Sequence, residues 1–90
     1  MEFEFLKVSL DIGREHGTDV ALFYSYLKFV NKKIQKDDHG YFRLDANYIF
    51  RGLGWERGKF RHIRDLAVKA NLIDYIGGSN QNEKPRYKII

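Results

Sequence analysis

The sequence predicts one α+β domain, built from three helices and a small antiparallel sheet and preceded by an extended amino-terminal segment. Three observations support this: helical spacing of apolar residues over 18–36 and 56–70, a short glycine-broken stretch between them, and a strand-turn-strand pattern over 73–90. Ninety residues suffice for a single domain, 1–90, and a core of that size leaves little room for an enzyme cleft.

The composition is typical of a globular protein, with 43% hydrophobic and 16% aromatic residues. Because the chain contains no cysteine, neither disulfides nor cysteine-bound zinc can hold the fold, and a reducing cytoplasm is the expected compartment. The longest nearly uncharged apolar stretch, Val20 to Leu27, is far shorter than the roughly 20 residues of a membrane span. The first four residues are acidic where a signal peptide is basic, so we expect no membrane association.

The amino-terminal residues 1–17 are predicted to form an extended arm or a short strand. Apolar and polar residues alternate, imperfectly, from Phe3 to Leu10. A turn from Gly13 to Gly17 then separates this arm from the first helix.

The first helix is predicted over 18–36, beginning at Thr18-Asp19. Its apolar residues recur at helical spacing and form a stripe for burial: Val20, Phe23, Leu27, Val30 and Ile34. A second stripe widens this face and consists of Leu22, Tyr26 and Phe29. The wider face requires cover from the amino-terminal arm, from a partner chain in a homodimer, or from both.

A turn, a short strand and a second helix follow. Asp37-Asp38-His39-Gly40 carries turn residues, and the aromatic stretch 41–44 predicts a strand. Asp45 is the expected cap of a brief helix over 45–52, which Gly52-Leu53-Gly54 ends.

The third helix, 56–70, has a buried and an exposed face. Its apolar residues lie within about 80° of one another at 100° per residue: Phe60, Ile63, Ala67 and Ala70. Arg61, His62, Asp65 and Lys69 project from the opposite side. A hairpin over 73–90, with a polar loop at 77–85, completes the chain, and the 41–44 strand is free to join it in a three-stranded sheet.

The net charge of +4 is concentrated in one segment, 51–69. That segment holds six basic and two acidic residues, and the ten basic and ten acidic residues elsewhere cancel. The basic ones are Arg51, Arg57, Lys59, Arg61, Arg64 and Lys69. Such a run is compatible with a solvated helix face or with a surface for a polyanion such as DNA.

The order helix, strand, helix, turn, helix, hairpin is that of a winged helix-turn-helix. Leu53-Gly54-Trp55, the basic stretch 61–66 and Ala70-Asn71-Leu72-Ile73 resemble the pattern of that superfamily over about half the chain. With 5–8 and 40–44, the layout also resembles the amino-terminal DNA-binding domains of phage replisome-organiser and plasmid replication-initiator proteins. Many superfamily members cap the third helix with Ser or Thr, whereas this chain has Trp55-Glu56.

The resemblance implies sequence-specific binding of double-stranded DNA, with the third helix in the major groove and the hairpin as a wing. The implied DNA-binding residues are Arg57, Gly58, Lys59, Arg61, His62, Arg64, Lys84 and Arg86. Arg57 and Arg61 are the expected base readers, His62 a donor to a base or a phosphate, and the remaining cations phosphate ligands. Gly58 allows close backbone approach, although tolerance of glycine near a helix end explains it equally well. Arg64 or Lys69 could instead pair with Asp65 or with other surface acids.

The sequence carries no motif for catalysis. The three histidines are scattered, and no phosphate loop or nucleophile motif is present, so we expect no enzyme, no cofactor, no metal and no small-molecule substrate. A metal at Asp37-Asp38-His39 is far less expected than a solvated turn. The DNA-binding role could be replication initiation or transcriptional regulation, which use the same helix.

The rival function is a winged-helix module for protein interaction or dimerisation without DNA binding. Four aromatic residues could line such a surface: Tyr24, Tyr26, Tyr48 and Trp55. Residues of these types more often belong to the core or its edge, so the DNA-binding interpretation is favoured.

Overall fold

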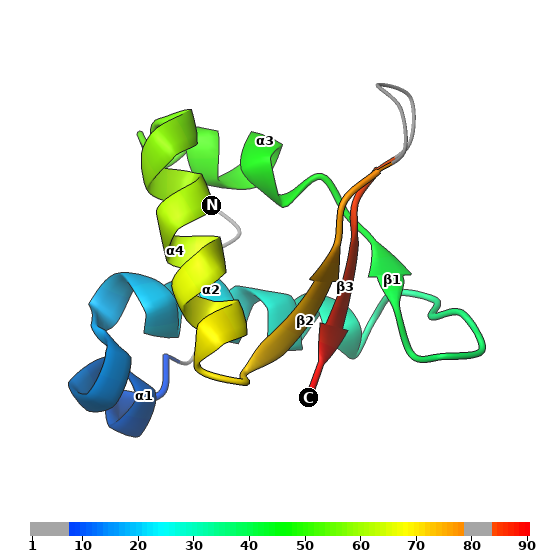
Figure 1. Cartoon of the computed structure of the whole chain (residues 1–90), viewed down its shortest axis with the longest axis horizontal. Coiled ribbons are helices and arrows are strands. Elements are labelled where there is room, and N and C mark those ends of the chain that lie inside the picture. Colours follow the sequence, from blue (N-terminus) through cyan, green and yellow to red (C-terminus); the bar gives the residue numbers. More distant parts are fainter. Residues whose placement is uncertain (1–7, 79–83) are drawn as a thin grey trace.

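The computed structural model describes residues 8–78 and 84–90. The fold is α+β, with helices and a three-stranded antiparallel sheet, and it is compatible with a winged helix. In chain order the elements are α1 (Leu10–His16), α2 (Thr18–Asn31), β1 (Phe42–Arg43), α3 (Ala46–Arg51), α4 (Arg57–Lys69), β2 (Ile73–Ile76) and β3 (Arg86–Ile89). In Figure 1, α4 stands beside the hairpin, on the side away from β1.

The sheet has the strand order β1-β3-β2. Phe42 pairs with Tyr87, which in turn pairs with Tyr75, and this row of aromatic residues faces the helices. Because side chains alternate along a strand, Arg43 and Arg86, the next cross-strand pair, lie on the opposite face. The predicted strand 41–44 therefore joins the hairpin as expected, although its regular part is limited to two residues.

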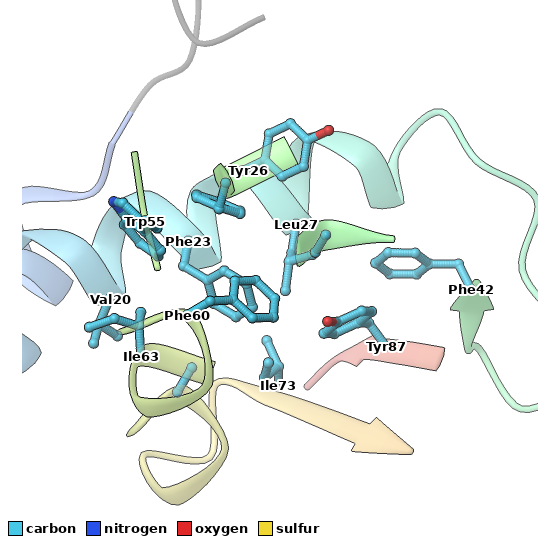
Figure 2. Packing of buried hydrophobic residues seen from close by; sticks show 13 residues of the cluster. Val20, Phe23, Tyr26, Leu27, Phe42, Trp55, Phe60, Ile63, Ile73 and Tyr87 are labelled. Carbon is cyan, nitrogen blue, oxygen red and sulfur yellow. The ribbon is translucent and has the colours of Figure 1, made fainter. Parts of the chain in front are cut away.

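Aromatic rings make up most of the core, and Phe23 of α2 lies at its centre (Figure 2). Its ring centre is 5.3 Å from that of Phe50 and 5.6 Å from that of Phe60. Trp55 stacks on Phe50 at 4.6 Å. A few large rings thus connect α2, α3 and α4, which is how a short chain obtains enough apolar contact to fold.

The predicted arm over 1–17 is wrong where the structure can be compared with it, because 10–16 form helix α1. Ser9 caps this helix, its hydroxyl accepting a hydrogen bond of 3.3 Å from the backbone N–H of Ile12. Gly17 separates α1 from α2. Its φ angle is 97°, which glycine adopts without strain. The cap at Ser9 and the glycine at the end of the helix favour α1 over the extended arm that the imperfect alternation of apolar and polar residues suggested. Residues 1–7 of the predicted arm lie outside the described residues.

The described chain therefore contains four helices rather than the predicted three, and α1 packs against α2. This contact supplies part of the cover that the wide apolar face of α2 requires. Tyr26 from the second stripe is buried, and Leu22 is partly buried against the core.

Helix α2 ends at Asn31, five residues before the predicted end at 36. The N–H groups of Lys33 and Ile34 both donate to the carbonyl of Val30 at 2.9 Å, which closes the helix in a turn. The ammonium group of Lys36 then donates to the carbonyl of Asn31, so a side chain replaces the next helical turn. Ile34 still packs against the core from this turn.

The two other helices agree closely with the predictions. Asp45 caps α3 by accepting a hydrogen bond of 3.2 Å from the N–H of Tyr48. Phe60, Ile63 and Ala67 of α4 are buried, as their spacing predicts. The glycine turn before α4 includes Gly54 at φ 86°.

Candidate nucleic-acid interface

The exposed side of α4 carries most of the predicted site. Gly58, Arg61, His62 and Asp65 are exposed, while the opposite side of the helix is buried in the core. A Cβ atom added at Gly58 would meet no atom within 4 Å, so the space above this backbone is open. In the described parts of the chain neither Arg57 nor Arg61 forms an ion pair or a side-chain hydrogen bond, which leaves two guanidinium groups available to a ligand.

A hollow of about 210 Å³ is lined by residues of α4 and of the hairpin. Its walls come from the start of α3, from α4, from β2 and from the start of β3. The lining residues are Asp45, Asn47, Arg57, Phe60, Arg61, Arg64, Tyr75, Pro85 and Tyr87. Three of the predicted arginines thus gather at one concave surface.

Arg64 is anchored at this surface by two neighbours. Its guanidinium carbon lies 4.2 Å from the centre of the Tyr75 ring, and its terminal nitrogen lies 3.2 Å from the carboxylate of Asp65. Only 17% of the Arg64 side chain is exposed. The alternative that Arg64 pairs with Asp65 is confirmed, and the side chain connects α4 to β2.

Lys59 lies on the other flank of α4, against α2. Its ammonium nitrogen is 3.2 Å from the carboxylate of Asp19 and 5.1 Å from the centre of the Trp55 ring. Lys59 is thus engaged with α2, and it does not line the hollow.

Lys84 and Arg86 lie on the hairpin, on either side of Pro85. Lys84 is exposed, and its carbonyl accepts a hydrogen bond of 3.3 Å from the guanidinium group of Arg43. Arg86 is partly buried on the outer face of the sheet, in register with Arg43. The structure therefore separates Arg86 from the arginines of α4, although the adjoining Pro85 reaches the hollow.

The outer face of the sheet also holds a polar contact between distant residues. The hydroxyl of Tyr41 donates to the carboxylate of Asp74, and the ammonium group of Lys88 lies 5.5 Å from the centre of the Tyr41 ring. This hydrogen bond, together with one from the N–H of Tyr75, lowers the pKa of Asp74. The same contact raises the pKa of Tyr41, so the pair holds its proton on the phenol.

The turn at 37–41 is organised by its own aspartate. Asp37 accepts hydrogen bonds from the N–H groups of His39, at 2.9 Å, and Tyr41, at 3.0 Å. The bond from Tyr41 is the main cause that lowers the pKa of Asp37. The carboxylate thus stabilises the turn that the sequence predicts. Residues 8–78 and 84–90 contain no group of three or more side chains that could hold a metal ion.

The four aromatic residues of the rival interaction surface do not lie together on the exterior. Tyr26 and Trp55 are buried in the core. Tyr24 is partly buried, and Tyr48 alone is largely exposed, at 66%. This distribution removes two of the four residues on which that interpretation depended.

Several residues of the hollow were not predicted from the sequence: Asp45, Asn47, Tyr75 and Pro85. Asp45 was identified only as a helix cap. No local sequence pattern places Tyr75 and Pro85 beside α4, because their position depends on how the hairpin packs against the helix. Asn47 is an isolated amide, and only its neighbours in the folded chain show that it lines the hollow.

No protein-family model, curated protein or solved structure matches this chain. Within the described ranges, none of the helices has both the length and the hydropathy needed to cross a bilayer.

Proposed function

We propose that this chain is a winged-helix domain that binds double-stranded DNA sequence-specifically, with α4 in the major groove and the hairpin as the wing. The observation that carries the proposal is the exposed face of α4, where Arg57 and Arg61 have no partner in the described parts of the chain. Arginines at i and i+4 repel each other on a helix, and an anionic ligand removes that repulsion.

Groove geometry assigns different tasks to the residues of α4. The major groove is about 12 Å wide and admits one helix, whose outermost side chains reach the base edges. Arg61 and His62 project from the exposed side beside the open backbone of Gly58. Arg61 is therefore the base reader, suited to two hydrogen bonds with guanine, and His62 is a donor to a base or to a phosphate.

Phosphate contacts position the protein without reading sequence. Lys84, which is exposed just before β3, supplies such a contact, while Lys59 has Asp19 as its alternative partner. In this proposal the protein is a DNA-binding component of replication initiation or of transcriptional control, and not an enzyme.

Binding to duplexes tests the proposal. We expect a fluorescent random duplex to bind weakly at low salt, with affinity that falls as salt rises, because phosphate contacts release counterions. A duplex selected from a random pool should bind about a thousandfold more tightly or better. Equal affinity for selected and random duplexes would contradict sequence-specific recognition.

The same sample in a sedimentation experiment separates this proposal from the rival one. A chain that self-associates but binds neither duplex at low salt is an interaction module. The distribution of the aromatic residues, with Tyr26 and Trp55 in the core, favours DNA over that outcome.

A further inference from the structure

We infer that the hollow between α4 and the hairpin is a subsite for a single phosphate group, with Arg57 as its principal ligand. The sequence alone suggested that Arg57 reads bases. In the structure Arg57 lines the hollow together with Arg64, one side chain on each side of Phe60 along α4. Residues at i−3 and i+4 from a buried position lie at the edge of the buried face, so both side chains are directed toward the hairpin.

The charges around the hollow fit one phosphodiester or one phosphate ion. Three arginines line it, and the only carboxylate among its lining residues is that of Asp45. Asp65 neutralises part of the charge of Arg64, so in the free protein the three arginines leave an excess of between one and two positive charges. That excess matches a single phosphate and falls short of a di- or triphosphate.

The acid in the hollow does not block the site. Asp45 is held in place as the cap of α3, where one of its oxygens accepts a hydrogen bond of 3.2 Å from the N–H of Tyr48. Its charge sets an upper limit on the anion that the three arginines can accept. Asn47 adds an amide group, which can donate to an oxygen that the arginines leave free.

The size of the hollow points to the same ligand. Its volume of about 210 Å³ is below the range of about 300–1,000 Å³ found for sites that enclose a drug-sized molecule. A phosphate group with its first waters fits, since a water takes about 30 Å³ in the liquid. Tyr75 and Pro85 form an apolar wall against which the adjoining sugar can pack.

Arg64 has a supporting role in this subsite. The ring of Tyr75 and the carboxylate of Asp65 fix its guanidinium group in the wall, so it adds positive charge without having to move. Arg57 has no such neighbours in the described parts of the chain and is free to turn toward the anion. If the proposed function holds, the phosphate belongs to the DNA backbone beside the base that Arg61 reads.

A first experiment measures phosphate binding without DNA. We expect inorganic phosphate to raise the Tm of the wild-type chain by about 5–10 °C at about ten times Kd, relative to chloride at equal ionic strength. Arg57→Ala should lose most of this rise. Lys69→Ala, which removes the same charge from the same helix at an exposed position outside the hollow, should keep it.

Phosphate that stabilises the wild type, Arg57→Ala and Lys69→Ala equally, or no more than chloride does, would overturn the subsite. Because Arg57 is exposed, its replacement should leave the circular dichroism spectrum unchanged, so a lost response is not a folding defect. This result is independent of whether the chain binds DNA.

A second experiment identifies the source of the phosphate. Single uncharged methylphosphonate linkages are placed in turn along a bound duplex. We expect one linkage to weaken wild-type binding by about tenfold to a hundredfold, the loss of a charged hydrogen-bonded contact, and to have little effect on Arg57→Ala.

Stabilisation by phosphate without any sensitive linkage would support the subsite, assign it to a free phosphate ion, and count against the proposed function. Sensitive linkages that are the same in Arg57→Ala would contradict the role of Arg57 while leaving DNA binding intact.

Discussion

The guanidinium group of Arg64 lies over the ring of Tyr75, with 4.2 Å between its central carbon and the ring centre. The ring centre of Tyr75 in turn lies 5.2 Å from that of Tyr87, which is buried in the core, so a chain of contacts runs from α4 through β2 to β3. This relationship links the helix to the hairpin at the hollow, which Arg64, Tyr75 and Tyr87 all line.

Arg64→Ala should lower the free energy of unfolding by about 0.5–2 kcal/mol, because it removes a cation–π contact and the packing of a mostly buried side chain. Arg64→Lys keeps the charge but loses the flat stacking surface, so its stability should be intermediate. Urea denaturation of the three proteins measures both effects. Identical stability of the alanine variant and the wild type would show that the contact with Tyr75 is not stabilising.

Gly58→Ala should change the stability of the chain and its affinity for DNA in opposite directions. Alanine stabilises a helix by about 0.5–1 kcal/mol relative to glycine, and the added methyl group meets no atom within 4 Å. We therefore expect a higher Tm together with weaker binding to duplex DNA, because the methyl group occupies the space in which the backbone approaches the groove. A stabilised variant with unchanged affinity would favour simple tolerance of glycine at this position.

Arg61→Ala and Lys84→Ala should have different consequences for DNA binding. Loss of a base-reading arginine costs about 1–3 kcal/mol and relaxes the preference at one base pair, whereas loss of a phosphate-binding lysine weakens all duplexes alike and reduces the salt slope by about one. Affinities for the selected duplex, its single-base variants and a random duplex at two salt concentrations distinguish these effects. The mechanism fails if both variants bind as the wild type does.

Tyr41→Phe should change how stability depends on pH. The hydrogen bond from Tyr41 is the largest cause that lowers the pKa of Asp74 below its ordinary value of 3.8. A depressed carboxyl pKa contributes stability that is present above the unfolded-state pKa and is lost as the pH falls through the folded-state pKa. The wild type should therefore have the higher Tm at neutral pH, and the difference should shrink below about pH 4.

Tyr48→Phe provides the matched control for this measurement, since Tyr48 is exposed on α3 and its hydroxyl forms no hydrogen bond within the described parts of the chain. A constant difference between Tyr41→Phe and the wild type over the whole pH range would exclude Asp74 as the titrating partner.

The elements with strong periodicity could be predicted from the amino-acid sequence. Phe60, Ile63 and Ala67 predicted the buried face of α4, and Asp45 predicted the start of α3, because spacing and capping are local properties of the chain. The strands of the hairpin were predicted from local alternation, and the predicted 41–44 strand, which was free to join them, pairs with β3. The sequence also located the whole net charge in the segment that includes α4.

Weak local signals gave the wrong structure at the amino terminus. Ser9 and Gly17 set the ends of α1, but an imperfect alternation of apolar residues suggested an extended arm. The end of α2 was placed too late, because Lys36 caps it from beyond the helix and apolar Ile34 belongs to the turn. In both cases a side-chain hydrogen bond lies at an end of the helix, where the spacing of apolar residues gives no signal.

Which cations gather at the hollow, and which are paired elsewhere, depends on long-range contacts that the sequence does not indicate. Arg57, Arg61 and Arg64 meet Tyr75 at one hollow, whereas Lys59, two residues from Arg57 in the sequence, is held by Asp19. These contacts join residues that are far apart in the chain, so their geometry follows from the packing of α4 against α2 and the hairpin. Periodicity specifies the face of a helix on which a side chain lies, but the partner it meets there depends on the fold as a whole.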